Sequence, residues 1–222
     1  MLEDSLSTLL GQPAETLGAG RTDSGVHARE MYAHFDCDTD FDADTLVFRL
    51  NALLPEAIAV RRIFKVADDA HARFDATART YEYWVTQCKD PFLTDAAYYI
   101  KHPLNVASMN NATELLLQHE DFECFSKSNT DVKTYRCDIS EAYWKESEDL
   151  LVFTITADRF LRNMVRAIVG TLLKIGQGRW TRETLQTILT EKDRSKAGPS
   201  VPAKGLYLTS VRYPEKINGP HG

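Results

Sequence analysis

The chain has 222 residues, of which 43% are hydrophobic and 26% are charged, and this composition is typical of a folded globular protein. Apolar runs of the roughly 20 residues needed to cross a bilayer are missing, and the acidic start MLEDSLSTLL does not resemble a signal peptide, so we expect a cytoplasmic protein without a membrane segment. The net charge of −6 argues against nucleic-acid binding over the whole surface.

The charges are unevenly distributed along the chain. Residues 1–70 contain 13 Asp or Glu and 6 Lys or Arg, whereas residues 151–222 contain 5 acidic and 12 basic residues. A polyanion could therefore bind the last third of the chain despite the acidic total. A solvated helix face would produce the same pattern.

The first half of the chain alternates between helical and strand-like patterns. Leucines at helical spacing predict a helix over residues 2–10. The most regular alternation, RTYEYWVTQC, predicts a strand over residues 79–88. The other elements expected here are a strand at 30–38, a helix at 44–54 with Asp44 as its cap and Pro55 at its end, and a strand at 58–67.

The second half contains the patterns of a hairpin and three helices. The predicted elements are a helix at 104–119, a hairpin at 137–158 that turns around residues 146–149, a helix at 159–178, a helix capped by Thr181, and a strand at 205–213. Interspersed strands and helices favour an α+β fold, with a mostly antiparallel sheet and helices on one face. The turn-rich segment 90–105 predicts a boundary between domains at 1–100 and 101–222.

Patterns typical of metal and cofactor sites are missing from the sequence. The four cysteines form no CxxC pair, and His27 and His34 lack the HExxH spacing. The acidic run from Asp36 has Phe41 and Val47 where a calcium loop needs glycine and an acidic residue. Neither GxxxxGK[ST] nor GxGxxG occurs. We therefore expect neither a metal nor a cofactor.

The segment GAGRTDSGVHA, residues 18–28, contains a carboxylate between glycines. Asp23 follows Arg21 by two residues, and it precedes a strand-like stretch. Aspartate and glycine are ordinary in tight turns. The same pattern would also suit a carboxylate that a rigid loop holds for chemistry.

Three further residues point to chemistry on a nucleotide. Tyr81 lies on the strand predicted at 79–88, and Arg162 and Arg166 are four residues apart on a predicted helix, where they would share a face. A cation near a carboxylate favours its ionised form, and an aromatic ring suits a base taken out of its stack. Each of these parts also occurs in unrelated folds.

Five segments together resemble the TruA family of tRNA pseudouridine synthases. They are GAGRTDSGVHA, RFDATARTYEYWV, DFECFSKSN, FLRNMVRAIVGTLLKIGQG and AKGLYLTSVRYP, which occur in the family's order and span residues 18–214. The stretch GRTDSGVHA is the most specific of them. The resemblance favours the second interpretation of the Asp23 loop, a carboxylate held for chemistry.

The resemblance implies a role for six residues. The family's catalytic aspartate falls on Asp23, the arginine that pairs with it falls on Arg166, and the aromatic residue that stacks on the target base falls on Tyr81. Three further substrate-binding positions are implied: Arg21, which would hold a phosphate or position the extruded nucleotide, Arg162, and Leu206, which would line the pocket.

The family isomerises uridine to pseudouridine in the anticodon stem-loop of tRNA, typically at nucleotides 38, 39 and 40. The reaction adds and removes no atom, so it requires no redox or group-carrying cofactor. The family fold is an antiparallel sheet built from two ferredoxin-like halves, usually in a homodimer that binds tRNA across both subunits. The resemblance implies the same fold, reaction and partners for this chain.

The sequence departs from the family pattern at its start. Family members normally begin with a strand and a segment like YDGTxYxGWQ, whereas this sequence starts within the helix that follows them. We therefore expect the first strand of the N-terminal half to be absent, and a tRNA-binding protein with impaired catalysis is an alternative function. A glycosidase that uses carboxylates is a third, and the lack of a clear second catalytic carboxylate counts against it.

Overall fold

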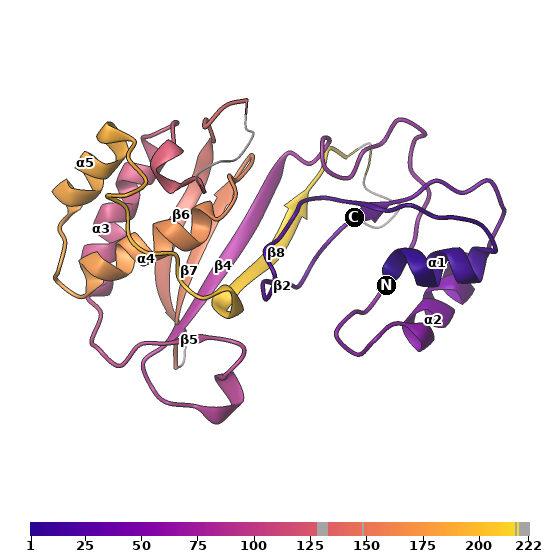
Figure 1. The fold of residues 1–222 in the computed structure, drawn as a ribbon, viewed down its shortest axis with the longest axis horizontal. Coiled ribbons are helices and arrows are strands. Elements are labelled where there is room, and N and C mark those ends of the chain that lie inside the picture. The colour runs from indigo at the N-terminus through magenta and orange to yellow at the C-terminus, as the bar shows by residue number, and fades with distance from the viewer. Residues whose placement is uncertain (128–132, 148, 216, 218–222) are drawn as a thin grey trace. The chain divides into compact units, whose positions relative to one another are not determined.

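The structure is a computed structural model that describes residues 1–127, 133–147, 149–215 and 217. The chain forms two compact units: unit 1 comprises Met1–Arg21, Met31–Ala76 and Tyr213–Gly222, and unit 2 comprises Thr22–Glu30 and Thr77–Arg212 (Figure 1). Residues 77–100 thus pack with the C-terminal part of the chain. The assignment of two ferredoxin-like halves to residues 1–100 and 101–222 stays a prediction.

Unit 1 is built around two short helices. Helices α1 (Leu2–Leu10) and α2 (Ala43–Leu53) pack against each other through buried leucines. A two-stranded antiparallel sheet pairs β1 (Leu17–Gly18) with β3 (Ala33–His34). The buried residues of this small core are Leu6, Ala14, Leu46, Leu50 and Leu54.

Side-chain hydrogen bonds explain two corrections to the elements predicted for unit 1. Asp42, and not Asp44, caps α2, because its Oδ1 accepts a hydrogen bond from Thr45 N at 2.8 Å. The prediction of a strand at 58–67 is wrong, since the structure describes these residues and they form no strand. The side-chain amide of Asn51 bonds both N and O of Val60, at 2.7 Å each, and so satisfies the backbone there without a partner strand.

Unit 2 contains a six-stranded sheet. The strand order is β2-β8-β4-β7-β6, and β5 pairs with the end of β4. The pairs β4–β7, β4–β8 and β6–β7 are antiparallel, whereas β2–β8 and β4–β5 are parallel. The sheet is therefore mixed rather than antiparallel throughout. The strands are β2 (His27–Ala28), β4 (Ala78–Thr86), β5 (Tyr98–Tyr99), β6 (Ile139–Ser147), β7 (Leu150–Ala157) and β8 (Leu206–Arg212).

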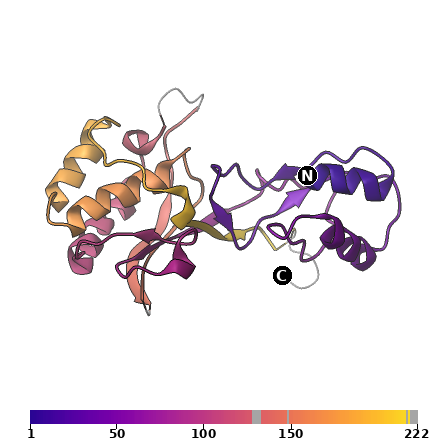
Figure 2. The same cartoon turned by 60° about the horizontal axis from the view of Figure 1, so that its bottom comes forward.

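Three helices lie on one side of this sheet, as predicted, and they bury the main hydrophobic core against it (Figures 1 and 2). Fully buried rings and aliphatic side chains such as Tyr83, Phe153 and Ile168 make up this core. Among the described residues, no helix has the length and apolar character to span a membrane. The helical elements are α3 (Val106–Leu117), α4 (Met164–Gly176), α5 (Arg182–Glu191) and the short 3-10 turns η1 (Pro91–Leu93), η2 (Glu123–Phe125) and η3 (Ala203–Gly205).

Several predictions for unit 2 are confirmed. The strand at 79–88 and the strand at 205–213 correspond to β4 and β8, and the hairpin is formed by β6 and β7. Thr181 caps α5 by accepting a hydrogen bond from Thr184 N. The hairpin turn includes residue 148 and the motif DFECFSKSN ends at residue 129, and both positions lie outside the described residues.

Helix α4 begins five residues later than predicted. Asn163 adopts the left-handed conformation with φ 67°, which a right-handed helix cannot contain. The helix therefore starts at Met164, and Arg162 lies in the loop before it. The prediction that Arg162 and Arg166 share one face of a helix is wrong.

Candidate active site

A tight turn places Asp23 and connects it to the sheet of unit 2. The backbone N–H of Val26 donates to the carbonyl of Asp23 at 3.2 Å, and Gly25 has φ 82°, a value that glycine adopts without steric cost. Strand β2 follows at once and pairs with β8, and Arg29 N donates to Leu208 O at 2.8 Å. The loop is therefore held at its C-terminal end by main-chain hydrogen bonds.

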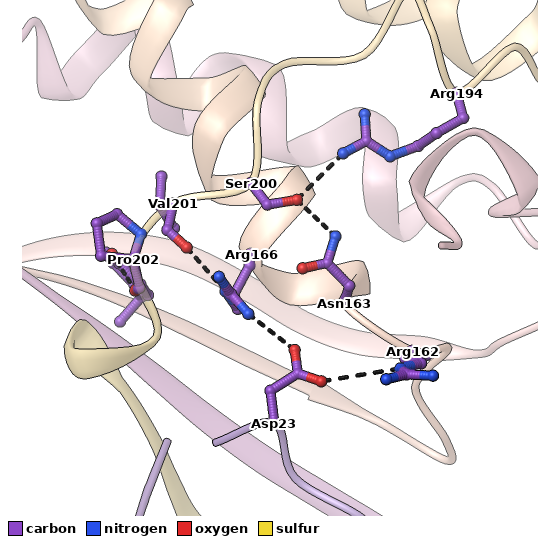
Figure 3. Close-up of polar contacts among 9 residues, drawn as sticks. Asp23, Arg162, Asn163, Arg166, Arg194, Ser200, Val201 and Pro202 are labelled. Carbon is purple, nitrogen blue, oxygen red and sulfur yellow. Dashed lines mark hydrogen bonds and ion pairs between the residues drawn. The ribbon is translucent and has the colours of Figure 1, made fainter. Parts of the chain in front are cut away.

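Each carboxylate oxygen of Asp23 faces a guanidinium group. Nη1 of Arg166 donates to Oδ2 at 2.8 Å, and Nε of Arg162 lies 3.9 Å from Oδ1 (Figure 3). The side chains of Asp23 and Arg166 are 28% and 20% exposed, whereas that of Arg162 is 60% exposed. The short, partly buried contact with Arg166 is therefore the stronger of the two, because an exposed ion pair at 3.9 Å contributes little.

The guanidinium of Arg166 is also held from its other side. Its Nε donates to the carbonyl oxygen of Val201 at 2.7 Å, and the backbone N–H of Val201 donates to the carbonyl of Arg166 at 3.2 Å. One carbonyl and one carboxylate thus fix two different nitrogen atoms of one planar group. This geometry sets the direction in which Arg166 presents Nη1 to Asp23.

The charge of Asp23 affects the pKa of Tyr81. Burial raises the pKa of its hydroxyl group, and the Asp23 carboxylate raises it further, while Arg79 acts in the opposite direction. The ring of Tyr81 contacts Phe160 edge-on, with 5.2 Å between the ring centroids. This ring contact joins strand β4 to the segment before α4.

The remaining two predicted site residues are placed differently. Leu206 begins β8, is 6% exposed, and pairs with Tyr83 across the sheet while packing in the core. Arg21 is exposed and belongs to unit 1, and its role in substrate binding stays a prediction.

Two contributors to the site were missed in the sequence, Val201 and Phe160. Val201 acts through its backbone carbonyl, and no residue type can signal such a contact. Phe160 was attributed to a helix that begins only after it. A weak indication was present in the sequence GPSVP at 198–202, since glycine and prolines close together are typical of an irregular segment that packs tightly.

The arrangement suits nucleophilic or acid–base chemistry by a carboxylate. Asp23 has two guanidinium neighbours, Arg166 at 2.8 Å and Arg162 at 3.9 Å, and Tyr81 supplies an aromatic ring of the kind that stacks on a base. Within the described part of the chain, no group of His, Cys, Asp or Glu side chains could hold a metal ion. The geometry thus presents the carboxylate of Asp23 between two guanidinium groups.

Comparisons with known proteins identify the family. A model of the tRNA pseudouridine synthase family matches residues 112–214. A tRNA pseudouridine synthase A of Parabacteroides distasonis is 51% identical over 217 residues, which cover 97% of this chain and 86% of the relative. The chain belongs to the tRNA pseudouridine synthase A family. As a tRNA pseudouridine synthase, it is an isomerase that acts on tRNA.

Other members of the tRNA pseudouridine synthase A family are also similar over more than nine-tenths of this chain. The protein of Bacteroides thetaiotaomicron is 52% identical over 219 residues, with 97% of this chain and 81% of the relative covered. The protein of Streptococcus gordonii is 40% identical over 209 residues, with 92% of this chain and 84% of the relative covered. The similarity therefore extends over both compact units and includes the segment that carries Asp23.

Proposed function

We propose that Asp23 is the nucleophile with which this tRNA pseudouridine synthase isomerises uridine in the anticodon stem-loop of tRNA, at nucleotides 38, 39 and 40. The observation that carries the proposal is the carboxylate of Asp23, which accepts a 2.8 Å hydrogen bond from Arg166 and faces Arg162 at 3.9 Å. The choice of the anticodon stem-loop rests on the family resemblance of the motifs.

The reaction needs one group that attacks and then leaves. The bond between C1′ of the ribose and N1 of uracil breaks, the base rotates, and a bond forms between C1′ and C5. The hydrogen at C5 leaves as a proton and N1 gains one, so the net change is an isomerisation. Asp23 would attack either C1′ of the ribose or C6 of the base and be released at the end. Both routes require an ionised carboxylate.

The neighbouring residues have complementary tasks in this proposal. Arg166 orients the carboxylate through its 2.8 Å hydrogen bond, and Arg162, which is more exposed, is available to the substrate as well. Tyr81 stacks on the target base, which recovers about 1–3 kcal/mol of the few kcal/mol that extrusion of the base costs. By resemblance, Arg21 contacts a phosphate and Leu206 lines the pocket.

The tRNA would be bound mainly through its phosphates. The last third of the chain, residues 151–222, contains 12 basic and 5 acidic residues, so we expect tRNA affinity to fall as the salt concentration rises. The family resemblance also leads us to propose a homodimer. The tRNA substrate leads us to propose a cytoplasmic location.

The test is tritium release from tRNA that carries 5-³H-uridine. We expect release by the wild-type chain and none by Asp23→Asn, which keeps the shape of the side chain but removes its charge. Asp149→Asn, at an exposed position near the β6–β7 turn, is the matched control and should release tritium at the wild-type rate. Undiminished release by Asp23→Asn would refute the proposal.

The same experiment separates the alternative of a tRNA-binding protein with impaired catalysis. If the chain were such a protein, the wild type itself would retard tRNA in a gel and release no tritium. Tyr81→Leu gives a second test, because loss of a stacking ring should reduce turnover more than tRNA affinity. Equal losses of both would contradict the role of Tyr81 at the base.

A further inference from the structure

We propose that Ser200, together with Asn163 and Arg194, positions the guanidinium of Arg166 for the reaction at Asp23. None of these three side chains contacts Asp23 in the described structure, so they would act through Arg166 as positioning residues. The proposal rests on the proposed role of Asp23 and extends it to residues behind the site.

The orientation of Arg166 depends on an irregular segment, residues 198–202, which we call the strap. Val201, in the strap, accepts the Nε hydrogen bond of Arg166 at 2.7 Å. The strap lies outside the regular helices and strands, so its own backbone does not hold the carbonyl of Val201 in place. Other contacts must fix the strap if Arg166 is to keep its direction.

The strap lies directly on α4. A Cβ atom at Gly170 would lie 1.8 Å from the carbonyl oxygen of Pro199, and one at Gly198 would lie 2.6 Å from the backbone nitrogen of Thr171. The N–H of Gly198 donates to the Thr171 hydroxyl at 2.9 Å. The two glycines therefore allow a main-chain approach that any larger residue would prevent.

The hydroxyl of Ser200 ties the strap to two other segments (Figure 3). Its Oγ accepts hydrogen bonds from Nδ2 of Asn163 at 2.5 Å and from Nη2 of Arg194 at 3.1 Å. Arg194 also donates from Nη1 to the carbonyl of Gly198 at 3.2 Å. One hydroxyl oxygen thus joins the strap to the segment after α5 and to the residue before α4.

Asn163 is placed to link both arginines of the site. It follows Arg162 directly, and its left-handed backbone ends the loop from which Arg162 reaches Asp23. Its side chain donates to Ser200 instead of capping α4. A loss of this tie would therefore disturb the loop of Arg162 and the strap behind Arg166 together.

A second tie lies on the other side of Val201. The hydroxyl of Tyr83, a fully buried residue of β4, donates to the carbonyl of Pro202 at 2.8 Å. Val201 is therefore flanked by two residues that are each held by side chains from elsewhere. Because a displacement of about 1 Å in a catalytic group can cost about a hundredfold in rate, these ties are expected to affect turnover.

The experiment compares steady-state tritium release by Ser200→Ala and the wild type. We expect kcat to fall about tenfold or more, while KM and the tRNA dissociation constant change less than about twofold. Ser200→Thr keeps the acceptor oxygen and should restore kcat to within about threefold of the wild-type value. Ser195→Ala, whose exposed hydroxyl bonds Asp193, is the matched control and should not change kcat.

Tyr83→Phe tests the second tie without the first. It removes only the hydroxyl that bonds Pro202, and we expect the same pattern of lower kcat at unchanged KM. It also keeps the proposal testable should Ser200→Ala fold poorly. Wild-type kcat in Ser200→Ala, or in Tyr83→Phe where the serine variant does not fold, would overturn the proposal, as would a rise in KM at unchanged kcat. Activity retained by Asp23→Asn would instead overturn the proposed nucleophile.

Discussion

Replacement of Arg166 by lysine would keep a positive charge beside Asp23 and remove the geometry that orients it. Arg166 uses two different nitrogen atoms, Nε for the Val201 carbonyl and Nη1 for Asp23, at 2.7 and 2.8 Å. The single ammonium nitrogen of lysine cannot occupy both positions. The variant therefore loses one of the two hydrogen bonds, and either the carbonyl or the carboxylate loses its fixed partner.

The magnitude follows from the geometry of the two arginines. A hydrogen bond that involves a charged group contributes about 1.5–3 kcal/mol, and each 1.36 kcal/mol is about a tenfold change in rate, so Arg166→Lys should lower turnover about 10- to 150-fold. Arg162 is 60% exposed and lies 3.9 Å from Asp23. Its contact contributes at most about 1 kcal/mol, so Arg162→Lys should cost no more than about fivefold.

The assay is single-turnover tritium release at saturating enzyme, which separates the chemical step from tRNA binding. Urea unfolding of both variants controls for a general loss of stability. A decrease in Arg166→Lys that is no larger than that in Arg162→Lys would refute the reasoning, because it would mean that charge alone, and not a directed guanidinium, supports Asp23.

Two further predictions concern packing and burial. Gly170→Ala should lower the free energy of unfolding by about 1–3 kcal/mol, since its Cβ would lie 1.8 Å from the carbonyl oxygen of Pro199, and an unchanged urea midpoint would contradict this. Burial raises the pKa of the Cys124 and Cys137 thiols to about 12, so both stay protonated at pH 8 and should react with a thiol reagent only after unfolding. The exposed Cys88 should react in the native protein, and equal native labelling of Cys124 would refute the burial argument.

The elements that the sequence predicted well are those whose pattern reflects the side chains that they bury. Strand β4 was predicted from the alternation of RTYEYWVTQC, in which the buried Tyr83 and Val85 lie two residues apart, and α5 was predicted because Thr181 caps it locally. The segment 58–67 has a strand-like composition and still forms no strand, and the side-chain amide of Asn51 takes both backbone hydrogen bonds of Val60. Periodicity reports burial, but it cannot report which group takes a backbone hydrogen bond.

For the site as well, the sequence predicted some features correctly and others wrongly. The motif around Asp23 and the pairing of Asp23 with Arg166 were predicted through the family resemblance, and the structure contains that ion pair. The geometric argument for Arg162 was wrong, because Asn163 ends the loop in a left-handed conformation and places Arg162 before the helix. The roles of Tyr81 and Leu206 in binding stay predictions.

The sequence by itself determined the α+β class, the family and the residue types of the site, since these depend on local patterns and on motifs in a specific order. Only the tertiary structure decided that Asp23, Arg166 and the carbonyl of Val201 form one row of contacts. In the sequence, Arg166 lies 143 residues from Asp23 and 35 residues from Val201. Hydrogen bonds over such separations depend on the packing of the strap on α4. That packing leaves no periodic signal, because it is made by two glycines and by main-chain atoms that every residue carries.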